Sequence, residues 1–431
     1  MKKLLFFALF LWLQIHLAGQ PLLQGVPEEV GMSSEKLKMI DAMTQKYIQE
    51  EKFPGGVILV ARRGLIVYYK SFGYRTPEKK AAYKNNDIFR IASMSKAITT
   101  VGIMQLYERG LLDLDDPVDK YIPAFRKTRV LDFINIADST YTTTPVIIPI
   151  TIRHLLTHTS GITYGDYESE EAKFIYKKLG LVNVGLSDTR WTTEQFINQL
   201  ALAPLAFQPG EKYSYGLNMD VLGRVIEVVS GQSLANYLRK SIFDPLKMDD
   251  TWFYLPKEKR DRLVPLYAHD KDDKLYITNS SGMIPLVDYP KMDDNNHYAG
   301  GGGLSSTAMD YARFIQALLN GGQLDGKRIL SRSTIQMMTS DQMIALNKKG
   351  NGFSKIPGYT YCLGFSLITE AAEGMSLKSP GTFEWGGYFD TKFFIDPEEE
   401  LIFVGMDNIT PNNHDYFWDR ITALVYGAIE D

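Results

Sequence analysis

The amino-acid sequence predicts an α/β protein of the α+β type, in which both ends of the chain build one antiparallel sheet flanked by helices. Strand-like runs rich in β-branched and aromatic residues occur near the two ends, and helix-like runs fill the middle. The strands come in pairs joined by tight turns, which favours hairpins over a parallel sheet. We therefore expect a sheet lobe, about residues 20–90 and 305–431, and an inserted, mostly helical lobe, about residues 91–304.

Residues 1–19 are expected to be a secretory signal peptide outside the folded part of the chain. Two lysines precede an apolar run from Leu4 to Leu13, and the small residues Ala18 and Gly19 follow it. A membrane anchor needs about 20 apolar residues, so this run is too short to be one. We expect export to a bacterial periplasm or the medium after cleavage, with residues 20–431 as the mature chain.

The regular elements are expected in a simple order. Gly55–Val60 and Leu65–Tyr69 are separated by Arg62-Arg63-Gly64, which is a hairpin signal. Helix-like stretches follow at Ala97–Arg109, Thr193–Leu202, Asp220–Ser230, Leu234–Ile242 and Thr307–Leu319. Strand signals return at Tyr359–Ile368, Thr391–Ile395 and Leu401–Met406, and an amphipathic helix over Tyr416–Ile429 closes the chain.

Composition and charge exclude several classes of protein. With 45% hydrophobic and 23% charged residues, the 431-residue chain is typical of soluble globular proteins. The net charge of −4 gives no reason to expect nucleic acid or an anionic membrane surface as a partner. Cys362 is the single cysteine, so no intramolecular disulfide is possible, and its apolar surroundings predict a buried thiol. We expect a small molecule as the partner.

The most informative local pattern is Ser93-Met94-Ser95-Lys96, which opens a helix-like run. Residues three positions apart on a helix lie on one face, with Cβ atoms about 5–6 Å apart. Lys96 can therefore reach the hydroxyl of Ser93, which is a poor nucleophile until a neighbouring base removes its proton. A lysine acts as that base only in an environment that favours its uncharged form.

Two further segments offer partners for this pair. Tyr215 stands directly before a helix-like run, so its phenol can project into a cleft and relay protons; a tyrosine that only packs is the alternative. The run Trp385-Gly386-Gly387-Tyr388 has adjacent glycines, which mark the close approach of a backbone to another group, or a tight turn. An N–H at this strand edge, together with that of Ser93, would form an oxyanion hole.

In this order the three elements resemble the serine β-lactamase and penicillin-binding-protein superfamily. The chain is most similar to the class C β-lactamase-like branch, which includes family VIII carboxylesterases, nylon-oligomer hydrolases and the statin side-chain acyltransferase. Three other stretches add to the resemblance: Leu114–Pro123, Ile152–Gly161 and Ala299–Thr307. The resemblance covers nearly the whole mature chain and implies a serine hydrolase that works through an acyl-enzyme, without a cofactor or a metal.

The resemblance also implies a role for each residue of the site. Ser93 matches the acylated nucleophile and Lys96 its activating partner. Tyr215 matches the tyrosine that acts as general base and acid, and Tyr213 is the runner-up. The backbone amides of Ser93 and Tyr388 match the oxyanion hole.

Substrate preference is expected to follow from two departures from the family pattern. Trp385-Gly386-Gly387 stands where β-lactamases have Lys-Thr-Gly, so the lysine that holds a substrate carboxylate is replaced. Asn218 follows Tyr215 one place later than in the family's Tyr-x-Asn, and it is our candidate for a further substrate contact. A charge-assisted hydrogen bond is worth roughly 1.5–3 kcal/mol, and tryptophan cannot supply it.

The resemblance therefore implies an enzyme that acts on carboxylic esters or related amides. The alternative is a β-lactamase or DD-peptidase that acts on β-lactams or cell-wall peptides. A non-catalytic protein on the same fold is the third interpretation, although Ser93, Lys96 and Tyr215 are all present.

Other patterns favour structural roles. His154 and His158 have the i, i+4 spacing of a metal pair, but no glutamate accompanies them in the H-E-x-x-H sense, and we expect no metal site. The glycines 300–303 lack the Gly-Lys-Ser/Thr of a phosphate loop and are expected to bring backbone close to the cleft. Asp270–Lys274 is expected to be an exposed hairpin turn. The loop Glu168–Trp191 and the segment Ile344–Pro380 are expected to line the mouth of the cleft.

Overall fold

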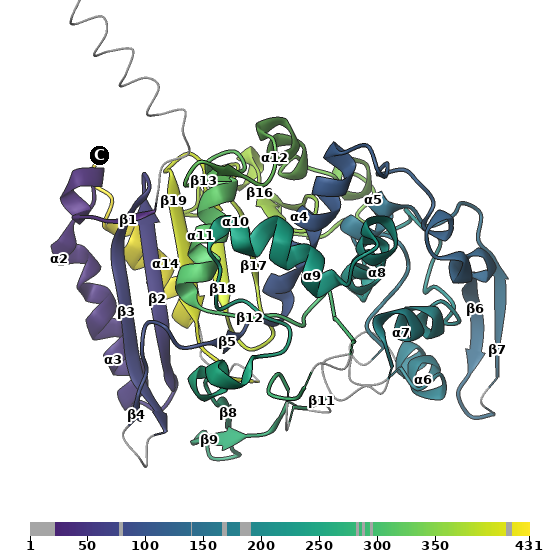
Figure 1. Ribbon diagram of the computed structural model, residues 1–431, viewed down its shortest axis with the longest axis horizontal. Coiled ribbons are helices and arrows are strands. Elements are labelled where there is room, and N and C mark those ends of the chain that lie inside the picture. Colours follow the sequence, from purple (N-terminus) through teal and green to yellow (C-terminus); the bar gives the residue numbers. More distant parts are fainter. Residues whose placement is uncertain are drawn as a thin grey trace, which may run out of the picture.

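The computed structural model describes residues 22–76, 81–138, 140–165, 170–181, 191–281, 284–286, 289–293, 296–410 and 416–431. Figure 1 shows a twisted sheet with helices on both faces and a largely helical region at one side of it. The expected signal peptide lies outside the described residues, as do residues 168–169 and 182–190 of the predicted cleft loop Glu168–Trp191. No described helix combines the length and the apolar composition needed to cross a membrane.

The main sheet takes its strands from both ends of the chain, as the sequence predicts. Its order is β1-β3-β2-β19-β18-β17-β16-β15, with β4 paired to β3, and every pair is antiparallel except β1 with β3. The strands are β1 (Leu23–Gln24), β2 (Gly55–Arg62), β3 (Leu65–Thr76), β4 (Ala81–Ala82), β15 (Tyr359–Tyr361), β16 (Ser366–Ile368), β17 (Phe383–Gly386), β18 (Lys392–Asp396) and β19 (Leu401–Met406).

The two chain ends meet in the centre of this sheet, where β2 pairs with β19. Every residue of these two strands is buried, because helices cover both faces. A strand buried on both faces has a continuous apolar sequence without alternation, which is the pattern of Val57–Val60 and Leu401–Val404. The central pairing therefore follows directly from the apolar runs at the two ends of the sequence.

Two apolar cores lie on the two faces of the sheet. On one face, α3 (Met39–Gln49) and α14 (Phe417–Gly427) pack against β2, β3, β18 and β19 (Figure 1). On the other face, α11 (Ala308–Leu319) packs against β2, β18 and β19 and joins the larger core, which continues into the helical region. The functional cleft described below borders this second core.

The helical region is built around α4 (Ser95–Glu108) and α8 (Asn218–Ser230), which pack against each other. Residues 95–106 of α4 are all buried, so this helix lies inside the core and has no solvent face. The remaining helices are α2 (Ser34–Leu37), α5 (Ile152–Leu156), α6 (Glu170–Lys178), α7 (Thr193–Leu200), α9 (Leu234–Leu238), α10 (Asp244–Leu246), α12 (Arg332–Met338) and α13 (Ile344–Asn347).

Several pairs of short strands lie outside the main sheet, and one of these strands directly precedes the functional site in the sequence. Strand β5 (Phe89–Arg90) pairs with β12 (Ser305–Ser306), directly before the Ser93 turn. The other short strands are β6 (Arg129–Asn135), β7 (Thr140–Pro145), β8 (Leu266–His269), β9 (Leu275–Thr278), β10 (Ser280–Ser281), β11 (Ile284–Pro285), β13 (Gln323–Leu324) and β14 (Lys327–Arg328). The turn at residues 270–274 joins β8 to β9, as expected.

Two expectations about elements need correction, and one helix was not predicted. The run Tyr359–Ile368 is not one strand but the hairpin β15–β16, because Gly364 adopts φ 82° and turns the chain back. Leu234–Ile242 is helix α9 only as far as Leu238 and continues as a π-helix over Arg239–Phe243. Helix α3 was absent from the sequence-based expectation. Cys362 is fully buried, as predicted.

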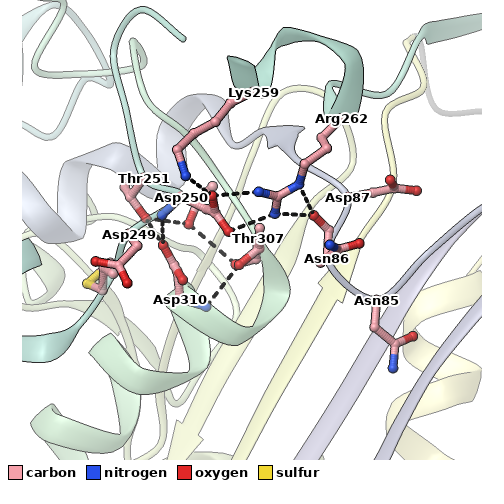
Figure 2. Close-up of polar contacts among 12 residues, drawn as sticks. Asn85, Asn86, Asp87, Asp249, Asp250, Thr251, Lys259, Arg262, Thr307 and Asp310 are labelled. Carbon is pink, nitrogen blue, oxygen red and sulfur yellow. Dashed lines mark hydrogen bonds and ion pairs between the residues drawn. The ribbon is translucent and has the colours of Figure 1, made fainter. Parts of the chain in front are cut away.

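A polar cluster ties α11 to the segment that precedes the site (Figure 2). Asp250 accepts hydrogen bonds from Lys259 (2.6 Å) and Arg262 (2.7 Å), and Arg262 also donates to the backbone carbonyl of Asn86. Asp310 of α11 accepts from the N–H of Asp250 (2.8 Å) and the hydroxyl of Thr251 (2.9 Å). Burial raises the pKa of the Asp310 carboxyl to about 6.

Candidate active site

Ser93 lies on a tight turn between β5 and α4. The turn is a 3-10 helix over Ala92–Met94, and α4 begins at Ser95. Ala92 has φ 40°, a left-handed conformation that is unfavourable for a residue with a Cβ atom. Such strained backbone persists only where the surroundings hold it, and here it leaves Ser93 half-buried beside the cleft.

The Lys96 side chain is fully buried, and its ammonium nitrogen points back at Ser93. Its Nζ lies 3.1 Å from Ser93 Oγ, 3.0 Å from Tyr164 OH and 2.5 Å from the carbonyl oxygen of Gly301. An ammonium has three donors, so these three oxygens can satisfy it completely. The structure thus brings together the serine and lysine that the sequence singled out.

Tyr215 stands on the other side of Lys96, in the loop that precedes α8. Lys96 Nζ lies 4.7 Å from the centroid of the Tyr215 ring. The indole N–H of Trp385 donates a hydrogen bond to the Tyr215 hydroxyl at 3.3 Å. The runner-up, Tyr213, instead packs its ring against Phe353 at 5.2 Å between centroids. Of the two tyrosines, Tyr215 is therefore the one in contact with Lys96.

Tyr164 is a site residue that sequence reasoning missed. It lies in the loop after α5, its hydroxyl contacts Lys96, and its ring lies 5.4 Å from the ring of Tyr215. Lys96 and Tyr164 are 68 positions apart in the sequence, and no short motif marks the tyrosine. Only its place shortly after the Thr159-Ser160-Gly161 stretch could have drawn attention to it.

The buried imidazole ring of His158 is neutral and packs against the ring of Tyr215. The two rings lie 4.7 Å apart, and His158 is fully buried with φ 54°. Its Nδ1 accepts the backbone N–H of Gly216 at 3.3 Å, so the proton of the neutral ring is on Nε2. Burial, with the nearby charge of Lys96, lowers the pKa of His158 well below its usual range. His158 therefore packs against Tyr215 without competing for its proton.

The expectation that Asn218 contacts substrate is wrong. Asn218 is fully buried at the start of α8, and its amide is already bound on both sides. Its Nδ2 lies 2.8 Å from His158 Nδ1 and 3.3 Å from the carbonyl of Ile162, while its Oδ1 accepts from Ser160 at 2.5 Å. Asn218 holds the loop that carries His158, and it has no surface to offer a ligand.

The segment after β17 approaches the Ser93 turn closely. A Cβ atom on Gly387 would stand 2.5 Å from the carbonyl oxygen of Ile91, so only glycine allows this approach. The Gly387 N–H donates to the carbonyl of Thr391 at 2.7 Å, which closes the turn that contains Tyr388. A cavity of about 470 Å³ runs along this edge, and its lining includes Ser93, Tyr215, Trp385, Gly386, Gly387 and Tyr388.

The lysines of this cavity do not replace the missing motif lysine. Lys392 pairs with Gly386 across the β17–β18 ladder, whereas Trp385 pairs with Phe393. Successive side chains of a strand point to opposite faces, so Lys392 and Trp385 lie on opposite faces of the sheet. Lys378 also borders the cavity, but its ammonium forms an ion pair with Glu384. Trp385 is therefore the side chain of this strand that faces Tyr215.

The two histidines with metal-like spacing make separate contacts. His154 Nδ1 accepts the N–H of Thr151 at 3.2 Å, which caps α5, and His158 is bound as described. The backbone of Gly301 passes directly beside Lys96, as expected for the run of glycines at 300–303. Within the described ranges, no group of three or more His, Cys, Asp or Glu side chains is arranged to hold a metal ion.

Known proteins are similar to this chain over most of its length. The Beta-lactamase family model matches residues 40–427. The chain is 32% identical to Protein Rv1367c of Mycobacterium tuberculosis, over 81% of this chain and 84% of that protein. It is 28% identical to Esterase EstB of Burkholderia gladioli, over 83% and 86%. The solved structure of EstCE1, a hydrolase with promiscuous acyltransferase activity, superposes with a TM-score of 0.77 at 27% identity, over 91% and 99%.

Proposed function

Because the chain belongs to the beta-lactamase family, we propose that it is a serine hydrolase that cleaves carboxylic esters, or related amides, through an acyl-enzyme on Ser93. The observation that carries the proposal is the contact of the buried Lys96 ammonium with Ser93 Oγ, at 3.1 Å, beside Tyr215. A serine hydroxyl held next to a group that can accept its proton is the arrangement that nucleophilic catalysis requires.

The reaction proceeds in two steps. Ser93 Oγ attacks the ester carbonyl carbon and gives its proton to the Tyr215 oxygen, which enters this step as a phenolate held beside the Lys96 ammonium and becomes a neutral phenol. Tyr215 then gives the proton to the leaving alcohol as the C–O bond breaks. In the second step water attacks the acyl carbon, Tyr215 accepts the proton of that water and returns it to Ser93. The backbone N–H groups of Ser93 and Tyr388 stabilise the oxyanion in both steps.

The substrate is uncharged where a β-lactamase would bind a carboxylate. Trp385 faces the cleft in place of the motif lysine, and Lys392 lies on the other face of the sheet. EstB is named an esterase and EstCE1 a hydrolase, which agrees with this preference. Esters are therefore favoured over β-lactams and cell-wall peptides.

The test of this function is hydrolysis of p-nitrophenyl esters of short acids by the wild-type protein and by Ser93→Ala. We expect turnover by the wild type and loss of it in the folded variant. Labelling by a fluorescent penicillin and hydrolysis of a chromogenic cephalosporin are measured in parallel with the ester hydrolysis. Strong β-lactam turnover with negligible esterase activity would favour the β-lactamase alternative. A fluorophosphonate probe that never labels Ser93 would favour a non-catalytic protein.

We also propose that the protein is exported after cleavage of a signal peptide. Residues 1–19 have the charged, apolar and small-residue order of a signal peptide, and residues 40–427 carry the family match. Intact-mass measurement of the secreted protein tests this, and a mass that retains residues 1–19 would contradict cleavage.

A further inference from the structure

Asp220 is a buried carboxylate next to the site that the mechanism above does not use. It lies in the first turn of α8 and is 3% exposed. Its Oδ1 accepts the N–H of Gly301 at 3.2 Å, and its Oδ2 has no hydrogen-bond partner among the described residues. An unsatisfied buried carboxylate oxygen is costly, so its presence beside Lys96 calls for an explanation.

Gly301 connects Asp220 to Lys96. Its N–H donates to Asp220, and its carbonyl accepts from Lys96 Nζ at 2.5 Å. A Cβ atom on Gly301 would stand 2.5 Å from Asp220 Oδ2 and 3.4 Å from Tyr164 OH. The free carboxylate oxygen and the Tyr164 hydroxyl therefore face the same side of Gly301, and that hydroxyl also contacts Lys96. Asp220 therefore lies next to Gly301 and on the side of it that the Tyr164 hydroxyl faces, and both of these groups contact Lys96.

The charge that acts on Asp220 comes from Lys96. Burial raises the pKa of the Asp220 carboxyl to about 6, and the positive charge of Lys96 opposes that rise. The segment after α5 holds the neutral His158 and the Tyr164 phenol, both of which lie close to Lys96. On the α7 side of α8, Glu194 is already paired with Arg224 at 3.0 Å.

We propose that Asp220 is a positioning residue for Lys96. Its carboxylate balances the ammonium charge inside the core and fixes Gly301, so that Lys96 keeps its position beside Ser93 while the Ser93 proton moves to Tyr215. This role rests on the proposed acyl-enzyme chemistry. When Asp220 takes up a proton, its negative charge is lost, and the lysine no longer has a counter-charge in its buried position.

The test is the pH dependence of kcat/KM for a neutral ester in the wild type and in Asp220→Asn. Hydrolysis of the ester is monitored by chromatography. The wild-type profile should lose activity on the acid side with a midpoint near the Asp220 pKa of about 6. In Asp220→Asn this acid limb should disappear or move by about one pH unit or more. The kcat/KM at neutral pH should fall about 100-fold, within the range of general acid–base effects.

Asp310→Asn is the matched control, because Asp310 is also buried with a pKa near 6 but binds Asp250 and Thr251 of the cluster in Figure 2. It should leave the pH profile of kcat/KM unchanged. Equal acid limbs in the wild type and Asp220→Asn would overturn the proposal, as would the same change of profile in Asp310→Asn.

If Asp220→Asn fails to fold, Asp220→Glu takes its place. It retains a carboxylate, so it should keep an acid limb and a kcat/KM within about tenfold of the wild type. A folded Asp220→Glu protein without an acid limb would overturn the role of the charge. Failure of the proposed function itself is recognised separately, because Ser93→Ala would then keep its esterase activity.

Discussion

The Nζ of Lys96 lies 3.1 Å from Ser93 Oγ, at a position with no exposure to solvent. The same nitrogen contacts Tyr164 and the carbonyl of Gly301. Three oxygens from three separate segments therefore fix the position of one ammonium group. Because these contacts hold the ammonium within reach of Ser93 Oγ, the geometry of Lys96 is the feature on which catalysis depends most directly.

Removal of the Lys96 amine should impair catalysis strongly. The replacing side chain must have a similar length, so that the fold stays intact. We expect Lys96→Met to lower kcat for a p-nitrophenyl ester by about 10³-fold, within the usual range for general acid–base groups. Lys392→Met is the control, because Lys392 lies on the opposite face of the sheet from Trp385. An equal loss in the two variants would contradict the assignment.

The two neighbouring tyrosines should differ sharply in importance. Tyr215 contacts Lys96 and Trp385, whereas Tyr213 packs against Phe353. We expect Tyr215→Phe to lower kcat by about 10²–10⁴-fold, and Tyr213→Phe to change it by less than about fivefold. Steady-state kinetics on one ester checks both. A larger loss in Tyr213→Phe would reverse the choice between them.

Glycine at position 387 should be essential for turnover. In Gly387→Ala the new Cβ would stand 2.5 Å from the Ile91 carbonyl and push the Tyr388 amide away from Ser93. Loss of one oxyanion donor typically lowers kcat by about 10²–10³-fold. Gly427→Ala is the control, because nothing lies within 4 Å of its Cβ position. Full activity in a folded Gly387→Ala protein would place the oxyanion hole elsewhere.

A lysine at position 385 should shift substrate preference toward carboxylates. In Trp385→Lys an ammonium would face the cleft, and one charge-assisted hydrogen bond is worth roughly 1.5–3 kcal/mol. We expect acylation by penicillin to rise about tenfold or more relative to acylation by a neutral ester. Stopped-flow acylation rates for both compounds give this ratio. An unchanged ratio would mean that Trp385 does not determine the preference.

Stability should depend on pH through Asp310. Its pKa is raised to about 6 in the fold from an ordinary value of 3.8, so the folded state favours the protonated carboxyl. The associated stability is present below about pH 4 and is lost as pH rises through 6, by roughly 2–3 kcal/mol. Asp310→Asn should remove this part of the slope. Urea unfolding of both proteins at pH 4.5 and 7.5 measures it, and parallel slopes would contradict the prediction.

The sequence predicted those parts of the site that local spacing and the family resemblance mark together. Ser93 and Lys96 lie one helical turn apart, so local spacing brings them together. Tyr215 was singled out by its match to the tyrosine of the family. The glycines 386 and 387 likewise marked a close approach of backbone. The central sheet was predictable because its buried strands are continuous apolar runs.

The rest of the site depends on contacts between distant segments, which no local pattern encodes. Tyr164 and Gly301 reach Lys96 across 68 and 205 positions. Asp220 was within a predicted helix, but its burial depends on how α8 packs against α4. Asn218 was assigned to the substrate because of its distance from Tyr215 in the sequence. The start of α8 instead turns it inward, toward His158.

The central claim is that Ser93 carries the acyl group of an ester during turnover. Acid quenching of the wild type during steady-state hydrolysis, followed by intact-mass measurement and peptide mapping, tests it most directly. We predict a mass increase equal to the acyl group, located on the peptide that contains Ser93 and absent from Ser93→Ala. Sustained turnover with no adduct at the shortest quench times, or an adduct on another residue, would contradict the account.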